Sequence, residues 1–389
     1  MSAPAVEVAD IVRAQGKRFM EVYGSRVSYQ QLKALRAIRN CRTAVLGHHI
    51  DACPKCGHAT QSYNSCRNRN CPKCQAGLRR RWIEARKHEV LGVEYFHVVF
   101  TVPDKLNPLA LQNPGEFYNL LFRASAATLV EVSTNPKHLG AKIGFVSILH
   151  TWGQNLLEHP HVHCLIPQGG IAQDGKRWVH SRRRYFLPKK VLGLVFRGKF
   201  IEGLRRLYQK KKLKFAGTLT HLNDPEEFGE YVRTVHRHEW VIDVRPALGG
   251  PEQVIRYLGR YTHRVAISNH RLVNFDGEKV TFLWKDYAHG HKWREMTLDS
   301  TEFLRRFVLH VLPKGFVRIR FFGFLANRFR ARCLELCRNL LSTNTAEKQN
   351  TDPLPESFAW LCPHCGTRML VVQRFTPAQW SSRGSFIEN

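Results

Sequence analysis

The stretch from Cys41 to Cys74 has no hydrophobic pattern from which a core could form, and cysteine, histidine, glycine, asparagine and arginine dominate it. It needs another organiser, because a segment that buries little apolar surface cannot offset the entropy lost when its backbone is ordered. Two CxxC pairs with a single cysteine between them can provide one. These cysteines are Cys53, Cys56, Cys66, Cys71 and Cys74. Two residues between thiolates let both sulfurs reach one tetrahedral ion, so the pattern predicts a closed, structural zinc site.

The spacing leaves the exact ligand set open. The simplest four-thiolate site uses both CxxC pairs, namely Cys53, Cys56, Cys71 and Cys74. Cys66 could replace one of them or build a second site with other nearby residues, which are Cys41, His48, His49 and His58. Near the other end, Cys362 and Cys365 form half of a further site, which Cys333 and Cys337 could complete. The total of 11 cysteines is odd, which argues against complete disulfide pairing.

The charge of the chain predicts a polyanionic partner. Lys and Arg total 60 against 31 Asp and Glu, for a formal net charge of +29, while hydrophobic residues make up 43% and indicate a folded protein. A folded protein this basic binds nucleic acids or anionic membranes. No run of about 18 apolar residues occurs, which predicts no membrane-spanning helix. The first residues lack the apolar core of a signal peptide. We therefore expect a cytoplasmic protein without a membrane partner.

Hydrophobic periodicity predicts a mixture of helices and strands. The expected helices cover residues 1–40, 78–91, 117–132 and 251–265. The expected strands cover residues 95–102, 145–149, 162–166 and 316–322, with shorter strands over 271–298. Residues 182–214 are dense in Arg and Lys with aromatic residues between them, a pattern typical either of a solvated basic helix or of one that faces DNA.

A His-hydrophobic-His motif, His161-Val162-His163, lies inside one of the expected strands. Alternate residues of a strand share a face, so both imidazoles would point the same way and could bind one divalent ion. His150 ends the preceding strand, and an antiparallel pairing would bring it alongside as a third nitrogen ligand. His159 and Gln154 are competing candidates for that third position.

Two tyrosines, Tyr257 and Tyr261, stand four residues apart on the helix expected over 251–265, so both phenols would lie on one face. Two tyrosines that pack in a hydrophobic core often have the same spacing. Here, however, the neighbouring side chains are basic, which suits phosphate better than an apolar interior. They are Arg256, Arg260, His263 and Arg264. A tyrosine can attack a DNA phosphodiester, and a metal held by histidines can polarise the phosphate under attack.

These motifs together resemble the HUH endonucleases, which are named for His-hydrophobic-His. Within them, the chain is similar to the two-tyrosine rolling-circle transposases of the insertion-sequence ninety-one family. The resemblance spans about residues 40–330. The segments that carry it are CRTAVLGHH, SCRNRNCPKC, HTWGQN, HPHVHCLIPQGG, YLGRYTHRVAISN, LWKDY and LPKGFVRIRFFGFLAN.

The resemblance implies an α+β fold: an antiparallel-sheet nuclease core flanked by helices, preceded by a small zinc-binding module and followed by a mixed C-terminal region. We expect four parts: a helical and zinc-binding DNA-recognition module at 1–92, the nuclease domain with the tyrosine helix at 93–270, a strand and helix extension at 271–341, and a linker with the CPHC tail at 342–389.

The implied activity is that of a transposase that nicks and rejoins single-stranded DNA at the ends of a bacterial insertion element. By this resemblance Tyr257 and Tyr261 are nucleophiles that form a covalent 5′-phosphotyrosine, and His150, His161 and His163 bind catalytic Mg²⁺ or Mn²⁺. The expected DNA-binding residues are Arg67, Arg69, Arg256, Arg260 and Arg264.

The implied partners are single-stranded element ends, hairpins and target DNA, met at the nucleoid. No GxxxxGK[ST] phosphate-binding loop occurs in the sequence. Strand separation would therefore come from a host helicase or the replication machinery.

Three other functions remain open at this point. A replication initiator or conjugative relaxase would use the same chemistry for a different outcome. A zinc-finger protein could bind DNA without any catalysis. A three-histidine zinc hydrolase is less favoured, because no carboxylate or general base accompanies the three histidines.

Overall fold

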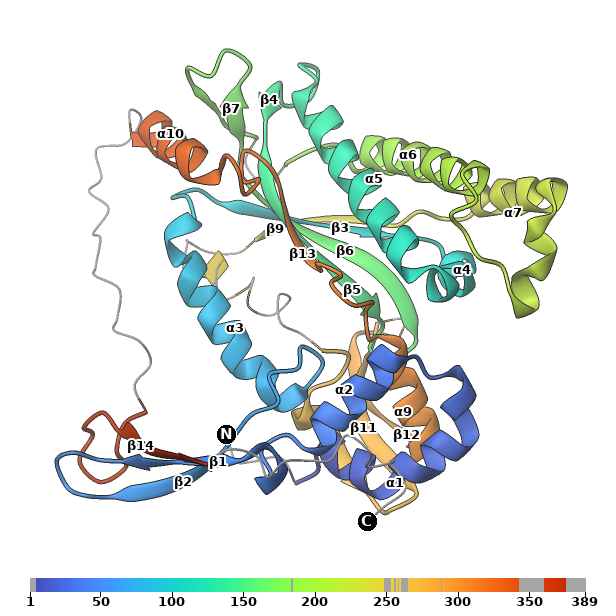
Figure 1. The fold of residues 1–389 in the computed structure, drawn as a ribbon. Coiled ribbons are helices and arrows are strands. Elements are labelled where there is room, and N and C mark those ends of the chain that lie inside the picture. Colours follow the sequence, from blue (N-terminus) through green and yellow to red (C-terminus); the bar gives the residue numbers. More distant parts are fainter. Residues whose placement is uncertain are drawn as a thin grey trace. The chain divides into compact units, whose positions relative to one another are not determined.

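The computed structural model describes residues 5–182, 185–247, 253–254, 257, 259, 265–287, 289–342 and 360–375. The chain forms two compact units (Figure 1). The cysteine unit comprises Met1–Gly77, Ile267–Val311 and Lys348–Asn389. The sheet unit comprises Leu78–Ala266 and Leu312–Glu347. Among the described residues, no helix is long and apolar enough to cross a bilayer.

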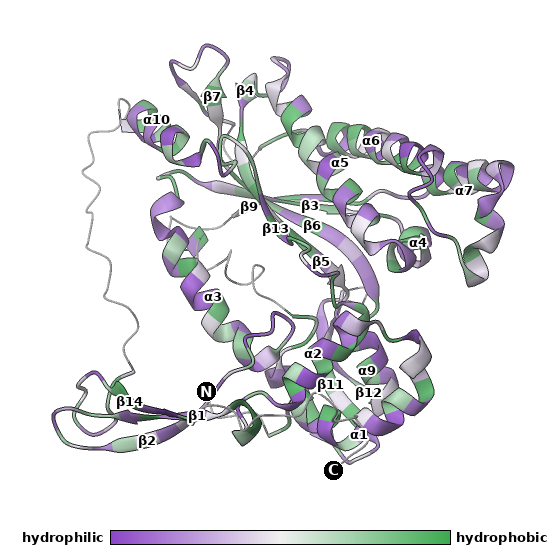
Figure 2. Ribbon diagram, in the orientation of Figure 1, coloured by the Kyte–Doolittle hydropathy of each residue, from purple (hydrophilic) through white to green (hydrophobic). Residues whose placement is uncertain are grey.

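The sheet unit is built on a five-stranded antiparallel sheet with the order β13-β5-β6-β3-β9. The strands are β3 (Tyr95–Thr101), β5 (Gly144–Trp152), β6 (Glu158–Pro167), β9 (Ile242–Ala247) and β13 (Ile319–Gly323). Figure 2 shows hydrophobic colour along β3 and β5. The strands expected near residues 95, 145, 162 and 316 are confirmed, and β5 and β6 extend beyond the expected limits because their pairing continues through the histidine-rich segment.

Helices cover one face of this sheet and form the main core with it. They are α4 (Asn107–Gln112), α5 (Pro114–Thr134), α6 (Lys189–Gln209) and α7 (Pro225–Arg237). Phe96, Phe100 and Phe145 point from the strands into this core, where Phe196 and Phe200 of α6 meet them. Each fully buried phenylalanine contributes about 2–3 kcal/mol relative to an exposed one. This packing holds α5 and α6 against the sheet.

Buried aromatic residues in α6 and just before it show what the aromatic positions of residues 182–214 do. Phe186, Phe196 and Phe200 are each no more than 3% exposed and belong to the core. They cannot stack on bases, so the interleaving of aromatic and basic residues does not mark a DNA-facing helix. The period of the aromatics is that of a core face, with the Lys and Arg residues left for the other side of the helix.

The opposite face of the sheet carries a smaller cluster that includes Val254. Tyr95, Val146, Ile148 and Leu165 pack there with the buried Val254. Tyr257 and Trp82 of α3 (Pro72–Arg86) border the same cluster. Gly259 approaches α3 so closely that an added Cβ would lie 2.3 Å from Ile83 Cδ1. The lack of a side chain at residue 259 therefore lets its backbone lie close to α3.

Three short strands and a last helix complete the sheet unit: β4 (Ala141–Lys142), β7 (Gly170–Ala172), β8 (Trp178–Val179) and α10 (Arg330–Ser342). The strands form a sheet of their own, in the order β4-β7-β8. Ile171 and Trp178 of this sheet share an apolar cluster with Leu334 and Cys337 of α10.

The cysteine unit combines segments from three parts of the sequence. Its helices are α1 (Val8–Tyr23), α2 (Tyr29–Arg39) and α9 (Ser300–Leu309). Its strands are β10 (Leu272–Phe275), β11 (Lys279–Asp286) and β12 (Lys292–Asp299) in one sheet, and β1 (His48–Ala52), β2 (Ala59–Tyr63) and β14 (Leu370–Phe375) in another. Ser28 caps α2 in a capping box with Gln31, and the Asp299 carboxylate caps α9.

These units divide the chain differently from the expected boundaries at residues 92, 270 and 341. Helix α9 packs on α1 and α2 rather than standing in an independent extension. The described tail residues pair with β1, far upstream in the sequence. Both segments carry apolar or backbone groups that need a partner, and local sequence patterns do not show that the partner lies at the other end of the chain.

Candidate active site and metal centres

Three histidines meet on the sheet face that bears Val254 and Tyr257. The register of β5 and β6 places His150 directly opposite His161 and Ile148 opposite His163. Since alternate residues share a face, all three imidazoles point to the same side, as the sequence pattern predicts. One ring nitrogen from each lies within 4.8 Å of the others. The structure therefore brings together the three histidines expected to bind the catalytic metal.

The nitrogens of this cluster are oriented as metal ligands would be. The His161 Nδ1 lies 2.6 Å from the His159 carbonyl oxygen, to which an Nδ1–H donates, so Nε2 is the nitrogen able to bind a metal. His150 Nδ1 and His163 Nε2 lie 3.1 Å apart. Two nitrogens bound at about 2.1 Å to one ion with tetrahedral or octahedral angles are about 3.0–3.4 Å apart. The donor set thus fits a single ion.

Of the two competing third ligands, His159 is not part of the histidine group. His159 contributes its backbone carbonyl to His161, and its ring is outside the group of three. Gln154 lies in the turn between β5 and β6.

A fourth histidine, His97, connects the cluster to Tyr257. His97 Nε2 is 2.8 Å from His163 Nδ1, and His97 Nδ1 is 2.8 Å from the Tyr257 hydroxyl oxygen. The Tyr257 and His97 rings meet edge to face, with centroids 5.3 Å apart. His97 is 6% exposed, and burial lowers the pKa of its imidazole to about 4. It is therefore neutral near pH 7, with one nitrogen that donates and one that accepts.

Sequence reasoning missed His97 because its strand, YFHVVFT, looks like an ordinary core strand. The available signal was the face of the strand on which His97 lies. His97 lies on the same face of β3 as Tyr95 and Val99. β3 pairs with β6, the strand that contains His161, Val162 and His163. A polar residue on that face of an adjacent strand lies diagonally across from His163, within side-chain reach.

Tyr257 is half-buried beside the Val254 cluster, with its hydroxyl on His97. The second expected nucleophile, Tyr261, lies outside the described residues, as do three of the expected DNA-binding arginines: Arg256, Arg260 and Arg264. The other two differ from each other. Arg67 is exposed, whereas Arg69 is partly buried, and burial lowers the pKa of its guanidinium.

A four-cysteine cluster organises the chain around the start of α3. It comprises Cys41, Cys66, Cys71 and Cys74. Cys74 Sγ is 3.6 Å from both Cys41 Sγ and Cys66 Sγ. Hydrogen bonds from Cys41, Cys66 and Cys71 hold the pKa of the Cys74 thiol far below its usual value, so the cluster already stabilises a thiolate. Four sulfurs in this arrangement fit a closed structural zinc site.

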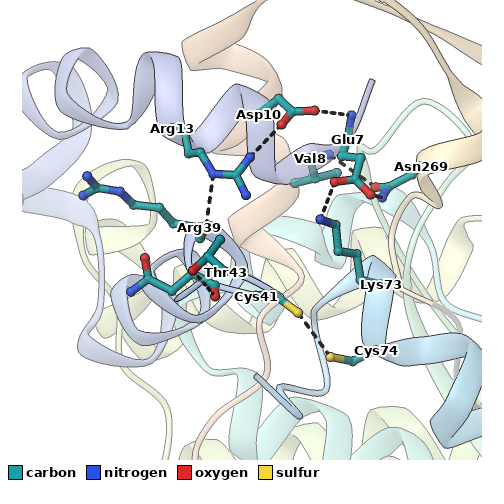
Figure 3. A network of polar contacts seen from close by, with 11 residues as sticks. Glu7, Val8, Asp10, Arg13, Arg39, Cys41, Thr43, Lys73, Cys74 and Asn269 are labelled. Atoms are coloured by element: carbon teal, nitrogen blue, oxygen red, sulfur yellow. Dashed lines mark hydrogen bonds and ion pairs between the residues drawn. The ribbon is translucent and has the colours of Figure 1, made fainter. Parts of the chain in front are cut away.

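Polar contacts tie this cluster to α1 (Figure 3). Lys73 Nζ lies 2.5 Å from a Glu7 carboxylate oxygen, and Asn269 donates to the other oxygen of Glu7 at 3.3 Å. Lys73 is therefore engaged in holding the module together, whereas Arg67 and Arg79–Arg81 are exposed.

The expectation of one zinc site from both CxxC pairs is wrong. Cys53 and Cys56 group with Cys362 and Cys365, away from Cys71 and Cys74. The reason is that Cys53 and Cys56 lie in the turn of the β1–β2 hairpin, while Cys41 follows α2 and returns to the second pair. Cys66, which the sequence allowed as a substitute ligand, belongs to the cluster with Cys41, Cys71 and Cys74.

The remaining candidate ligands have other roles. Cys337 of α10 is fully buried in an apolar cluster, and burial raises the pKa of its thiol to about 12. Neither it nor Cys333 joins Cys362 and Cys365. His48 stacks on Phe375, and His49 lies 3.1 Å from the Asn64 side-chain oxygen.

Comparisons with known proteins identify the chain's relatives. Residues 144–332 match a family model described as putative transposase, and residues 11–102 match one described as transposase zinc-binding domain. The chain is 48% identical over 351 residues to the putative transposase y4qJ of Sinorhizobium fredii, covering 90% of this chain and 88% of that one. It is 27% identical over 355 residues to the transposase for insertion sequence element IS801 of Pseudomonas savastanoi, covering 85% and 81%.

Among solved structures, the conjugative relaxase TrwC in complex with oriT DNA matches 43% of this chain and 71% of that chain, at 14% identity and a TM-score of 0.22. A metal-bound structure of the same relaxase gives a TM-score of 0.24. Likenesses at this level carry no argument about mechanism.

Proposed function

Because the chain belongs to the transposases that carry the zinc-binding domain of the insertion-sequence ninety-one family, we propose that it acts as a two-tyrosine rolling-circle transposase of the HUH type, which nicks and rejoins single-stranded DNA at insertion-element ends. In the proposed reaction a tyrosine oxygen forms a bond to the scissile phosphorus, and the bond from phosphorus to the 3′ oxygen breaks. The products are a covalent 5′-phosphotyrosine and a free 3′ hydroxyl. Tyr257 and Tyr261 are the proposed nucleophiles.

The observation that carries this proposal is the continuous contact from Tyr257 through His97 to the three-histidine cluster. The proposed nucleophile, the imidazole of His97 and the proposed metal ligands are therefore joined by contacts on one face of one sheet. A non-catalytic zinc-finger protein would have no need of this arrangement, and the cysteine clusters that serve such a protein lie in the other unit.

His150, His161 and His163 would hold Mg²⁺ or Mn²⁺. When bound, such an ion polarises the scissile phosphate and stabilises the charge that develops on the leaving oxygen. Three imidazoles leave coordination positions for phosphate oxygens, whereas the four-thiolate cluster leaves none. This difference is why we assign catalysis to the histidines and a structural role to the cysteines.

His97 would orient the nucleophile. A His163 Nε2 that binds a metal carries no proton, so its proton lies on Nδ1 and is donated to His97 Nε2. His97 must then carry its own proton on Nδ1 and donate it to the Tyr257 oxygen. A hydrogen bond donated to that oxygen favours the phenolate over the phenol and turns a lone pair toward the substrate. The tautomers of two histidines thus link the metal site to the nucleophile.

The net charge of +29 would hold the DNA strand over this site. Arg67 and the Arg79–Arg81 run are exposed and suit phosphate contacts. Arg69, Arg256, Arg260 and Arg264 complete the proposed DNA-binding set. Element ends, hairpins and target DNA would be bound partly as single strands, and a host helicase or the replication machinery would separate them.

The proposal is tested by incubating the full chain with a labelled single-stranded element end and Mg²⁺ and separating the products on a denaturing gel. We expect a band of protein covalently joined to DNA, which Tyr257→Phe, Tyr261→Phe or both remove. Tyr185→Phe is a matched control, since Tyr185 is an exposed tyrosine remote from the histidines in the sequence. A wild-type protein that binds the DNA but forms no adduct would refute the proposal.

A replication initiator or relaxase would also form the adduct. It would differ in the next step, because a transposase joins the tethered 5′ end to the 3′ hydroxyl of a different target strand. Adding an unlabelled target strand to the same reaction therefore tests the transposase outcome: a labelled joint product supports it, and re-closure of the original strand alone contradicts it.

A further inference from the structure

The second cysteine cluster draws its ligands from segments that are far apart in the sequence. Cys53 and Cys56 follow β1, and Cys362 and Cys365 precede β14. The zinc-binding family model ends at residue 102, so it contains only the first pair. Both pairs belong to the cysteine unit.

The two pairs form turns of the same construction. In the first, Cys53 N donates to the His58 carbonyl at 2.8 Å and Gly57 N donates to the Cys53 carbonyl at 3.0 Å. In the second, Cys362 N donates to the Thr367 carbonyl at 2.8 Å and Gly366 N donates to the Cys362 carbonyl at 2.9 Å. Gly57 and Gly366 have φ values of 73° and 70°, a left-handed conformation that favours glycine. Each turn is therefore a knuckle that presents two sulfurs to one point.

The four sulfurs lie at the separations expected around one ion. Cys53 Sγ is 3.4 Å from Cys365 Sγ, and Cys56 Sγ is 3.5 Å from Cys362 Sγ and 3.6 Å from Cys365 Sγ. Four sulfurs at about 2.3 Å from a tetrahedral zinc ion are about 3.8 Å apart. A disulfide would need about 2.05 Å. The spacing is thus that of a shared metal site.

Apolar burial cannot hold this part of the molecule together. The core cluster around it consists of Cys53, Cys362 and Met369, with Cys365 beside them. Five of the six residues of β14 are exposed, including Val372 at 62%. β14 nevertheless pairs with β1 along its length, and β1 pairs with β2. A three-stranded sheet without a packed face is marginal in water unless another interaction supports it.

We propose that Cys53, Cys56, Cys362 and Cys365 bind a second structural Zn²⁺, which fastens residues 360–375 onto the N-terminal module as the missing half of a zinc ribbon. The ion replaces the absent core and fixes the register of β14 on β1. The protein then contains two four-thiolate zinc ions, one within the family's zinc-binding domain and one that needs the C-terminal segment. This inference does not depend on the strand-transfer reaction.

Cobalt titration of the full-length, metal-stripped protein tests the stoichiometry, because only thiolate sites give sulfur-to-cobalt charge-transfer bands and the histidine cluster has no thiolate. We expect two equivalents in the wild type and one in Cys362→Ser/Cys365→Ser. Cys53→Ser/Cys56→Ser should also bind one equivalent. The variant with all four substitutions should still bind one equivalent, since both pairs serve the same ion. Cys333→Ala/Cys337→Ala is the matched control and should keep two.

One equivalent in the wild type would overturn the proposal, as would two in Cys362→Ser/Cys365→Ser or a loss in the control. A second measurement needs no cysteine substitution. With a protease site inserted between residues 343 and 359, the cleaved tail should stay with the rest of the chain during gel filtration and separate once a chelator is added. A tail that separates without chelator, or remains bound with it, would contradict zinc fastening.

Discussion

The cysteine clusters and the histidine cluster use metal ligands in opposite structural settings. The second cysteine cluster lies where apolar packing is scarce, because the small core around Cys53 and Cys362 has only Met369 as a further buried neighbour. The histidines lie on a sheet whose other face is packed against α5 and α6 through many buried phenylalanines. In the first setting a metal substitutes for a core, and in the second a finished core positions the ligands. Losing ligands should therefore damage folding in one unit and chemistry in the other.

The largest effect should come from Cys74→Ser in the first cluster. Structural zinc contributes on the order of 10 kcal/mol to the folding of small zinc domains, so we expect loss of that zinc and local unfolding around residues 41–77. Hydrogen exchange and zinc content measure both effects, with the sheet unit as internal reference. Retained protection in this segment without zinc would break the contrast drawn above.

The next effect should be that of His163→Ala on DNA cleavage. Removing one of three metal ligands should lower the rate of adduct formation by about 10³-fold, an effect of roughly 4 kcal/mol on the barrier. The thermal midpoint of the metal-free protein should change little, since the core lies on the other face of the sheet. His159→Ala is the matched control, because it keeps the backbone carbonyl that contacts His161 and removes a ring that lies beside His161 but outside the group of three ligands. Equal loss in both variants would argue against the assigned ligands.

A smaller effect is expected for His97→Ala. It removes the group between His163 and Tyr257 without removing a ligand, and loss of such a supporting group typically costs about 10–100-fold in metal affinity or activity. Isothermal titration with Mn²⁺ and the rate of adduct formation should both weaken. His97→Gln, whose amide can still donate or accept, should restore part of each. If His97→Ala lowers only thermal stability, the residue merely fills space.

The smallest effect should be on DNA affinity in Tyr257→Phe. Affinity for single strands comes mainly from neutralised phosphates, so the slope of binding against salt concentration should match the wild type. Fluorescence anisotropy at several salt concentrations gives that slope. A clear change would mean that Tyr257 also binds the strand, which would blur the separation between holding DNA and cutting it.

The sequence predicted the elements whose partners follow local rules. The alternation of His161 and His163 and their distance from His150 were enough to place three imidazoles on one face, and the β5–β6 register agrees. The buried strand at Tyr95–Thr101 was also predictable from the sequence. The role of His97 was not, because the sequence pattern is the same whether a buried histidine fills space or makes a hydrogen bond.

The cysteine grouping was beyond sequence reasoning for a different physical reason. CxxC spacing predicts a knuckle, yet any two knuckles can share an ion, and the choice depends on long-range strand pairing. Cys56 and Cys362 are 306 positions apart, and nothing local in either segment points to the other. The aromatic residues of α6 were ambiguous in the same way, since a core face and a base-stacking face have the same helical period.

The pairing of β14 with β1 also has a consequence in time. A ribosome that adds about 5–20 residues per second needs on the order of 15–60 s to synthesise the 306 positions that separate Cys56 from Cys362. During that interval the first knuckle has been made but its partner has not. A message that ends early would yield a chain whose β1–β2 hairpin lacks its third strand, so completion of this small sheet reports that translation has passed β14.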